Sequence, residues 1–288
     1  MIFWRIVDNR VLPVQEVDTL GFEESEGMRI PDEYLQEQEF VIMRACHGIG
    51  DYGIISAMPR LLKQKYPKCG VFLPSINLYR KLWGRDNKIV ESIYKNNPYV
   101  DGFVDSVKGD IFHDHYRVWN KDKSDIPLIK QMLKFWQFEE NEMEDCLPEI
   151  YWTTKEKTLG DDIIKDVVGG KDYGCLMISD RFGQDDKRFN PKTYEKHHSK
   201  LSKLLKENDY PYFYWSYKPI KELGFDFKKG LDLRNMDLRI QLYIKSKAKV
   251  NIGIQCGTTQ CISRYSKCIS IQRQFPMGGN IIDGEELV

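Results

Sequence analysis

The chain has 288 residues, about twice the size of a typical domain, so two domains with separate cores are expected. Its 43 basic and 43 acidic residues cancel, and no long block of one sign occurs, which excludes the charge pattern of a nucleic-acid or membrane-surface partner. There is no apolar run of roughly 18 residues and no signal-peptide pattern at the start. The seven cysteines are scattered without a Cys-x-x-Cys pair. These features predict a cytoplasmic protein with reduced thiols and no transmembrane segment.

Residues 1–39 are expected to form an appendage to the first domain. The apolar stretches at residues 3–7 and 11–14 flank Asp8-Asn9-Arg10, a pattern typical of a β-hairpin. The acidic stretch from Glu23 to Glu39 is expected to be a surface connection.

From Phe40 onward, short apolar runs alternate with amphipathic segments, which predicts a parallel sheet with crossover helices. The first domain is expected to span residues 40–168 and to end at Gly169-Gly170. Its predicted strands are residues 40–43, 70–73 and 102–104, and its predicted helices are residues 57–65, 88–94, 126–138 and 158–168.

The same alternation restarts in the second domain, residues 169–288. Its predicted strands are residues 175–178, 212–215, 250–254 and 268–271, and its predicted helices are residues 191–207, 238–245 and 258–265. The predicted fold class is α/β, with two such domains facing a cleft.

A glycine loop follows the first predicted strand, where backbone amides are open to a ligand. Gly48, Gly50 and Gly53 have the Gly-x-Gly-x-x-Gly spacing of dinucleotide sites. No acidic residue ends the second strand to hold a ribose, which weakens that interpretation. A nicotinamide- or flavin-dependent oxidoreductase stays an alternative.

Asp51 stands at the start of the helix that follows this loop. A carboxylate there repels a phosphate but suits a general base that faces a neutral hydroxyl, so the loop is expected to hold an acceptor. The structural alternative is a helix N-cap, a position that Asp favours.

Four stretches resemble glycosyltransferase family 9, the ADP-heptose lipopolysaccharide heptosyltransferases, in a divergent and short form. The first, "HGIGDYGIISAMPRLLKQKYPKCGVFLPS", is similar to the family's opening strand, Gly-x-Gly-Asp loop, helix and second strand. The others, which extend the resemblance over about residues 40–275, are "NNPYVDGFVDS", "DDKRFNPKTYEKHHSKL" and "LDLRNMDLRIQLYIKSKAKVNIGIQCGTTQCISRY".

The resemblance implies a GT-B fold, with two Rossmann-like domains. It implies an acceptor saccharide or glycolipid on the first domain and a nucleotide-diphosphate sugar, as co-substrate, on the second. Asp51 takes the position of the general base of an inverting transfer, and His47, Gly48 and Gly50 form the acceptor loop. Neither a cofactor nor a metal is implied.

Lys187 and Arg188 take the family's Lys-Arg position, where a fixed cation neutralises the diphosphate leaving group. Without the resemblance, the sequence "DDKR" is equally an exposed, self-compensating surface patch.

Gly257, Thr258 and Thr259 open the short helix that follows the strand at 250–254, and their amides and hydroxyls suit a pyrophosphate. The alternative is an ordinary helix capped by threonine. The sequence departs from the family in this segment, because Gln255, Cys256 and Gln260 replace an acid, a Ser or Thr and a histidine. Amides neither carry charge nor shuttle protons. These changes favour a second hypothesis, a GT-B-shaped protein that binds nucleotide sugars without turnover.

The run His113-Asp114-His115 is the one stretch with metal-ligand character. Only the two histidines share a strand face, and no third ligand is near in sequence, so a solvated loop is expected and no metal site is predicted.

Overall fold

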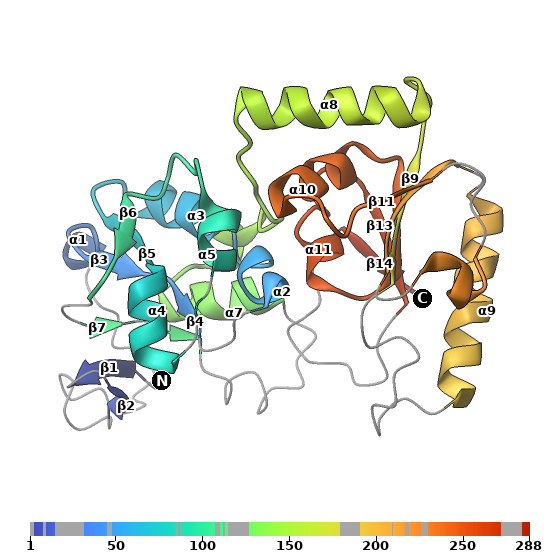
Figure 1. The fold of residues 1–288 in the computed structure, drawn as a ribbon. Helices are drawn as coiled ribbons and strands as arrows, with labels where there is room; N and C mark the ends of the chain where they lie inside the picture. Colours follow the sequence, from blue (N-terminus) through green and yellow to red (C-terminus); the bar gives the residue numbers. More distant parts are fainter. Residues whose placement is uncertain are drawn as a thin grey trace. The chain divides into compact units, whose positions relative to one another are not determined.

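The computed structural model describes residues 3–7, 10–14, 32–44, 48–84, 86, 88–106, 110–111, 113–114, 127–178, 191–208, 210–216, 219–225, 230–271 and 284–288 (Figure 1). Its contacts divide these residues into two units. The described residues up to Cys146 form unit 1, and those from Leu147 onward form unit 2. Two units agree with the count expected from the chain length.

Unit 1 contains short strands and short helices. Its strands are β1 (Phe3–Val7), β2 (Arg10–Val14), β3 (Glu39–Val41), β4 (Met43–Arg44), β5 (Gly70–Pro74), β6 (Gly102–Val104), β7 (Asp110–Ile111) and β8 (His113–Asp114). Its helices are α1 (Asp32–Leu35), α2 (Ile49–Gly53), α3 (Met58–Lys65), α4 (Ile76–Trp83), α5 (Lys88–Tyr94), α7 (Leu128–Phe135) and the 3-10 helix η1 (Glu140–Met143).

The parallel part of unit 1 is organised around one extended segment. β3 and β4 are its two pieces, separated by Ile42, whose N–H donates to the carbonyl of Phe72. β3 pairs with β5 and β5 with β6, whereas β4 pairs with β8, all in parallel. Across the segment, the strands therefore follow the order β6-β5-β3/β4-β8, and the strand order reverses between β4 and β8.

The predicted N-terminal hairpin is present, because β1 and β2 pair antiparallel. β1 also pairs with β7, Trp4 opposite Ile111, so the hairpin is joined to unit 1 through a strand.

An aromatic cluster forms part of the core of unit 1. The ring of Phe40 lies 4.2 Å from that of Trp136 and 5.7 Å from that of Tyr66. Tyr66 also donates a hydrogen bond from its hydroxyl to the carbonyl of Trp136. These contacts join β3 to the residues that directly follow α3 and α7. The apolar residues at helical spacing in α7 are themselves buried.

Helix α4 was not expected from the sequence. The Ser75 hydroxyl accepts a hydrogen bond from the N–H of Leu78 and begins the helix, and Gly84, at φ 66°, ends it. The amphipathic stretch between these caps is eight residues long.

Unit 2 has longer and more regular elements. Its strands are β9 (Gly174–Ile178), β10 (Tyr212–Ser216), β11 (Gly230–Asp232), β12 (Val250–Ile254), β13 (Lys267–Ile271) and β14 (Glu285–Leu287). Its helices are α8 (Thr154–Val168), α9 (Pro191–Glu207), α10 (Leu238–Lys247), α11 (Gly257–Gln260) and the 3-10 helix η2 (Ile220–Leu223). The helix predicted at 258–265 is thus shorter and starts one residue earlier.

These strands form one parallel six-stranded sheet in the order β11-β10-β9-β12-β13-β14. Numbered along the chain, this is the 3-2-1-4-5-6 order of a Rossmann sheet. The order reverses between β9 and β12. Their ladder extends as far as Gly253 opposite Met177, beyond which Ile178 pairs with β10 and Ile254 with β13.

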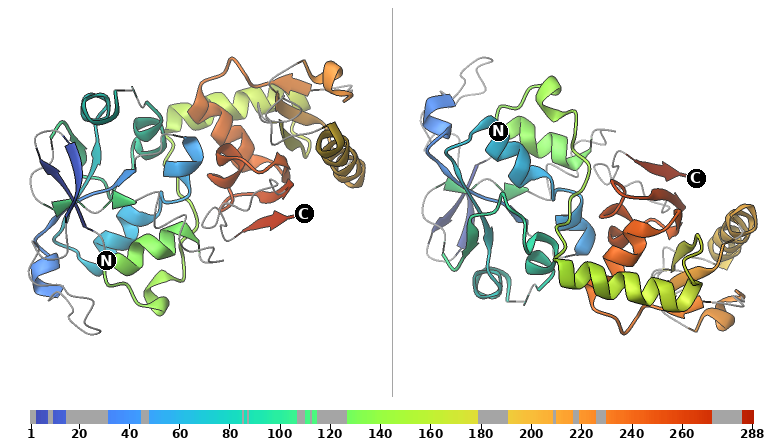
Figure 2. Two further views of the ribbon diagram at one scale, coloured as in Figure 1. Left: turned by 90° about the horizontal axis from the view of Figure 1, so that it is seen from below. Right: turned by 90° about the horizontal axis from the view of Figure 1, so that it is seen from above.

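Helices cover both faces of this sheet, which therefore has a core on each side (Figures 1 and 2). Phe213 and Cys175 point to the face covered by α8 and α10. Tyr212 and Leu176, their neighbours in sequence, point to the face that carries Leu201 of α9. Such two-sided burial explains why β9 and β10 are almost entirely apolar.

Helix α8 packs on α10 and belongs to unit 2. The boundary between the units therefore falls before α8, whereas the sequence predicted it after α8, near residue 168. Glu156 of α8, which is partly buried, forms an ion pair with the buried Arg239 of α10, with 2.6 Å between Oε1 and Nε. Burial opposes ionisation of Glu156, but the hydrogen bond from Arg239 prevails and lowers the pKa of Glu156 to about 2. Thr153 caps the helix together with Glu156, which is why α8 begins before the predicted residue 158.

Candidate functional site

Asp51 is the third residue of α2 and lies at the carboxyl end of β4. Its Oδ2 accepts a hydrogen bond of 2.7 Å from the N–H of Gly48, the residue before the helix. Asp51 is thus not the N-cap, although its carboxylate does satisfy a backbone donor at the helix start. A full capping box also needs an N-cap side chain that accepts from the N–H of the third helical residue, and Gly48 has none. The side chain of Asp51 stays 30% exposed, so the carboxylate can still meet a ligand.

Arg44, the last residue of β4, contacts the turn that carries Asp51. Its side chain is 3% exposed, and Nη1 donates to the backbone carbonyl of Asp51. Nη2 lies 3.8 Å from Oδ1 of the Asp51 carboxylate. A buried guanidinium therefore contacts both the backbone and the side chain of the candidate base.

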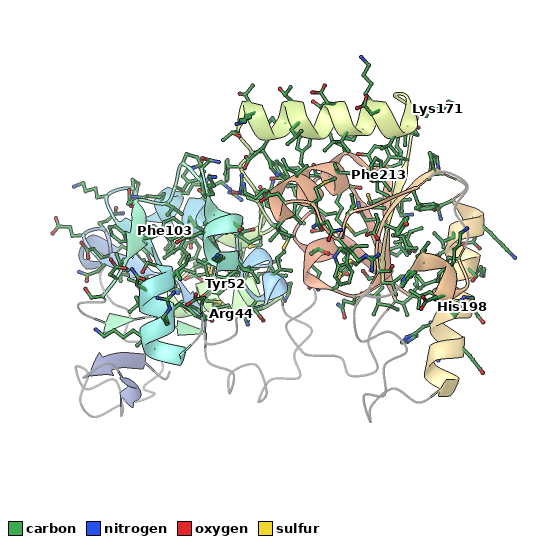
Figure 3. All side chains as sticks on the ribbon, in the orientation of Figure 1. Arg44, Tyr52, Phe103, Lys171, His198 and Phe213 are labelled. Carbon is green, nitrogen blue, oxygen red and sulfur yellow. The ribbon has the colours of Figure 1, made fainter. Side chains whose placement is uncertain are left out.

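Two buried tyrosines contact the backbone of Arg44, and a third contacts one of them; Figure 3 shows Arg44 and Tyr52 side by side. The Tyr52 hydroxyl accepts from the N–H of Arg44, and the hydroxyls of Tyr52 and Tyr79 lie 3.2 and 3.0 Å from its carbonyl oxygen. Tyr94 donates to the carbonyl of Tyr52. Burial raises the pKa of Tyr52 well above its usual value, so the phenol stays neutral and can donate.

The glycines of the loop differ in what they permit. A Cβ at Gly48 would lie 2.7 Å from Asp51 Oδ2, so only glycine leaves the carboxylate in place. Gly50 is inside α2, and its carbonyl accepts from the N–H of Ile54. His47, the third predicted acceptor-loop residue, lies outside the described residues. The second strand predicted for the first domain is β5, and Ser75, which caps α4, follows it directly. No acidic residue therefore stands at the end of β5 to hold a ribose.

On unit 2, the turn after β12 brings the other predicted residues together. Cys256 precedes α11 and its carbonyl accepts from the N–H groups of Thr259 and Gln260. Cys256 Sγ lies 3.4 Å from the hydroxyl oxygens of both Thr258 and Thr259. The interpretation of α11 as a threonine-capped helix is therefore wrong, since the capping position belongs to Cys256 and makes no side-chain cap bond.

Lys245 of α10 is a member of this site that the sequence analysis missed. Its side chain is 1% exposed, and Nζ donates to Thr258 Oγ1 at 2.9 Å. A signal was present in the sequence, because Lys245 falls at the spacing of Leu238 and Leu242, on one helix face. A charged residue at the position of an apolar one is the observation that would have identified it.

Glu285 of β14 was missed as well. The side-chain amides of Gln255 and Gln260 point their Nε2 atoms at Glu285 Oε2, 3.4 and 3.2 Å away. Burial raises the pKa of Glu285, and the hydrogen bonds that it accepts oppose the rise without cancelling it. A carboxyl group thus lies beside the two amides of Gln255 and Gln260, at positions where the resemblance implied ionisable residues. No local pattern announces Glu285, because only the pairing of β14 with β13 brings it there.

Both turns lie at a point where the strand order of a sheet reverses. The Asp51 turn follows β4, next to β8, and the segment 255–260 follows β12, next to β9. Loops beyond the carboxyl ends of strands at such points are where open α/β sheets bind ligands. The topology therefore supports each predicted segment as a ligand site of its own unit.

Lys187 and Arg188 lie outside the described residues, so their predicted role stays a prediction. His115 does too, and the side chains of His113 and Asp114 are not described. Within the described part of the chain, no group of three or more His, Cys, Asp and Glu side chains is arranged to hold a metal ion. No helix there combines the length and apolar character that a bilayer crossing needs.

Comparison with solved structures finds this fold among glycosyltransferases, including the following two. A glycosyl transferase of family 9 from Veillonella parvula superposes with a TM-score of 0.59 at 8% identity, over 88% of this chain and 85% of that one. The ADP-heptose lipopolysaccharide heptosyltransferase II of E. coli superposes with a TM-score of 0.51 at 10% identity, over 86% and 90%. No protein-family model and no curated protein matches the chain. The likeness confirms the predicted fold class, α/β with parallel sheets.

Proposed function

We propose that the protein is a glycosyltransferase that moves a sugar from a nucleotide-diphosphate donor to a hydroxyl of a saccharide or glycolipid acceptor. One observation carries the proposal: within a fold like that of a family 9 glycosyltransferase, Asp51 holds a part-exposed carboxylate at the carboxyl end of β4. A general base needs such a fixed and accessible position.

The reaction follows from these groups. The acceptor hydroxyl loses its proton to Asp51 while its oxygen forms a bond to the anomeric carbon of the donor sugar. The bond from that carbon to the phosphate oxygen breaks, and its electron pair leaves with the nucleoside diphosphate. Direct displacement inverts the configuration at the anomeric carbon. The carboxylate is the proton acceptor, so the step needs no external base.

The donor side is proposed for unit 2. Lys187 and Arg188 neutralise the charge that develops on the leaving diphosphate, a task that fixed cations perform without a metal. The hydroxyl of Thr258, which makes no cap bond to α11 and is only partly buried, supplies a further donor, whereas Thr259 is fully buried. The six cysteines that the structure describes form no disulfide, which supports the cytoplasm as the compartment of the reaction.

The test combines turnover and binding. Release of nucleoside diphosphate is measured with a panel of nucleotide sugars and saccharide acceptors, for the wild type, Asp51→Asn and the control Asp86→Asn. Asp86 is an exposed aspartate of unit 1 that pairs with Arg80 on the surface. We expect Asp51→Asn to lower turnover by roughly 10²- to 10⁴-fold, the usual contribution of a general base, with unchanged affinity for the diphosphate. Equal turnover of Asp51→Asn and the wild type contradicts the proposal.

A second candidate is a nucleotide-sugar-binding protein without turnover. It is favoured by Gln255 and Gln260, whose amides point at Glu285 and carry no charge. Thermal stabilisation by nucleoside diphosphates, with no consumption of any donor, selects this candidate over a transferase. Stabilisation by NAD(P) alone selects the third hypothesis, an oxidoreductase that uses the Gly48, Gly50 and Gly53 loop.

A further inference from the structure

Lys245 is the most deeply buried ammonium group described in unit 2. It lies in the last turn of α10 with 1% of its surface exposed, and its Nζ donates one hydrogen bond, to the Thr258 hydroxyl at 2.9 Å. Among the described residues, no carboxylate forms an ion pair with it. A buried charge is normally paired, because taking it out of water is costly.

The groups around Lys245 do not neutralise it. Burial raises the pKa of the Cys175 thiol to about 12, although Lys245 acts against that rise. Burial also raises the pKa of Cys268, so both thiols are neutral near pH 7. The carboxyl of Glu285 accepts from Gln255 and Gln260, not from Lys245. The C-terminal end of α10 favours a cation, but a helix end offsets only part of the cost of burial.

Thr258 connects this charge to the surface. Its hydroxyl oxygen accepts from Lys245, so its single hydrogen is directed elsewhere, toward Cys256 Sγ at 3.4 Å or toward a ligand. Thr258 itself is only partly buried. A hydroxyl polarised by an ammonium is a stronger donor to an anion than a hydroxyl alone.

We propose that Lys245 and Thr258 form an anion site on unit 2 that takes a diphosphate group, with Lys245 as a positioning residue that acts through the Thr258 hydroxyl. The bound anion is the counter-charge that no described residue provides for the buried ammonium. The site does not depend on the dipole of α11, which is a single turn. Its assignment to the diphosphate of a nucleotide sugar rests on the proposed function, whereas the anion site itself does not.

The test measures binding of inorganic pyrophosphate and of ADP to the full chain by calorimetry. The variants are Lys245→Met, which keeps the length of the side chain and removes the charge, and the control Lys247→Met. Lys247 is exposed on the same helix, with its ammonium 5.5 Å from the centre of the Tyr243 ring. We expect Lys245→Met to weaken pyrophosphate binding at least tenfold and Lys247→Met to leave it unchanged.

The melting temperature of the unliganded protein separates this role from a structural one. Because Lys245→Met removes an uncompensated buried charge, we expect the unliganded variant to melt at the same or a higher temperature, with a smaller upward shift on adding pyrophosphate. A lower melting temperature together with an unchanged pyrophosphate shift overturns the proposal. Wild-type protein that binds no pyrophosphate overturns it too.

Variants of Thr258 decide the matter even if Lys245→Met does not fold. Thr258→Val keeps the shape and removes the hydroxyl, and we expect the same loss of pyrophosphate affinity; Thr258→Ser restores the hydroxyl and the affinity. Equal binding by all three forms contradicts the proposal. Pyrophosphate binding that depends on Lys245, without sugar transfer, leaves this site in place and removes the proposed function. Sugar transfer together with diphosphate binding that is unchanged in Lys245→Met supports the proposed function and overturns the anion site.

Discussion

The turn after β4 in unit 1 and the turn after β12 in unit 2 occupy comparable places, beyond a parallel strand where the strand order reverses, yet their charges are arranged in opposite ways. In unit 1 a part-exposed carboxylate, Asp51, is held by the buried cation of Arg44. In unit 2 the buried cation of Lys245 donates to the hydroxyl of Thr258, and no described carboxylate pairs with it. The comparison teaches that one turn carries its counter-charge within the protein, whereas the other leaves a positive charge for a ligand to balance.

The largest effect is expected from the backbone that positions the unit 2 turn. A Cβ added at Gly253 would lie 2.2 Å from the carbonyl oxygen of Met177, so β9 and β12 must separate where their ladder ends. We expect Gly253→Ala to lower the free energy of unfolding by about 3 kcal/mol, the upper end of the usual cost of overpacking. Urea denaturation measures it.

A matched glycine makes that result specific. Gly102 also lies in a parallel strand, β6, but a Cβ there would meet nothing closer than 3.7 Å. Gly102→Ala should therefore shift stability by less than about 0.5 kcal/mol. Similar losses in the two variants would mean that close packing of β9 and β12 is not what positions this turn.

The next effect concerns the cation of unit 1. Arg44→Met removes the donor to the Asp51 carbonyl and the neighbour of its carboxylate, so we expect a loss of about 2 kcal/mol in the free energy of unfolding, as for a hydrogen bond to a charged group. Lys245→Met should show no such loss. Equal destabilisation by both variants, in urea denaturation at one pH, would remove the contrast between the two turns.

A smaller effect is expected at the start of α2. The Cβ of Gly48→Ala would displace the Asp51 carboxylate from the Gly48 N–H, so we expect a loss of about 1 kcal/mol, the usual value of a helix cap. Because the base is displaced, turnover should fall in the same variant. Gly102→Ala again serves as control, and a variant of Gly48 with full turnover would show that the cap does not position Asp51.

The smallest effect is a pH dependence in unit 2. Burial raises the pKa of Glu285 above its ordinary value of 4.5, so the folded protein holds this proton more tightly than the unfolded chain. The stabilisation is complete below pH 4.5 and is lost as the pH rises through the folded pKa. In Glu285→Gln, which no longer titrates, the free energy of unfolding should fall less between pH 4.5 and 7.

Glu286→Gln is the matched control for that experiment. Glu286 is the next residue of the same strand, and its exposed carboxylate pairs with Lys267. Its variant should keep the wild-type slope of unfolding free energy against pH. A wild-type slope in Glu285→Gln would mean that the carboxyl of Glu285 titrates normally.

Much of the fold follows from the sequence by local rules. The alternation of short apolar runs and amphipathic stretches predicted β5, α9 and β12 close to their observed bounds, because burial on one face or two leaves a repeat within a few residues. Helix-capping residues carry further local information about where helices begin and end. Thr153 with Glu156 and Ser75 with Gly84 are local signals that set the true bounds of α8 and α4.

The sequence alone determined the two-domain α/β plan and the position of Asp51 at a strand-to-helix turn, since both depend on neighbours along the chain. Only the tertiary structure decided that α8 packs on α10 and that the Arg44 guanidinium contacts Asp51. It also decided that the Glu285 carboxyl accepts hydrogen bonds from Gln255 and Gln260. These contacts join residues through strand pairing and helix packing, whose register is set by the whole core. A carboxyl or an ammonium has no visible partner in sequence until that core brings one to it.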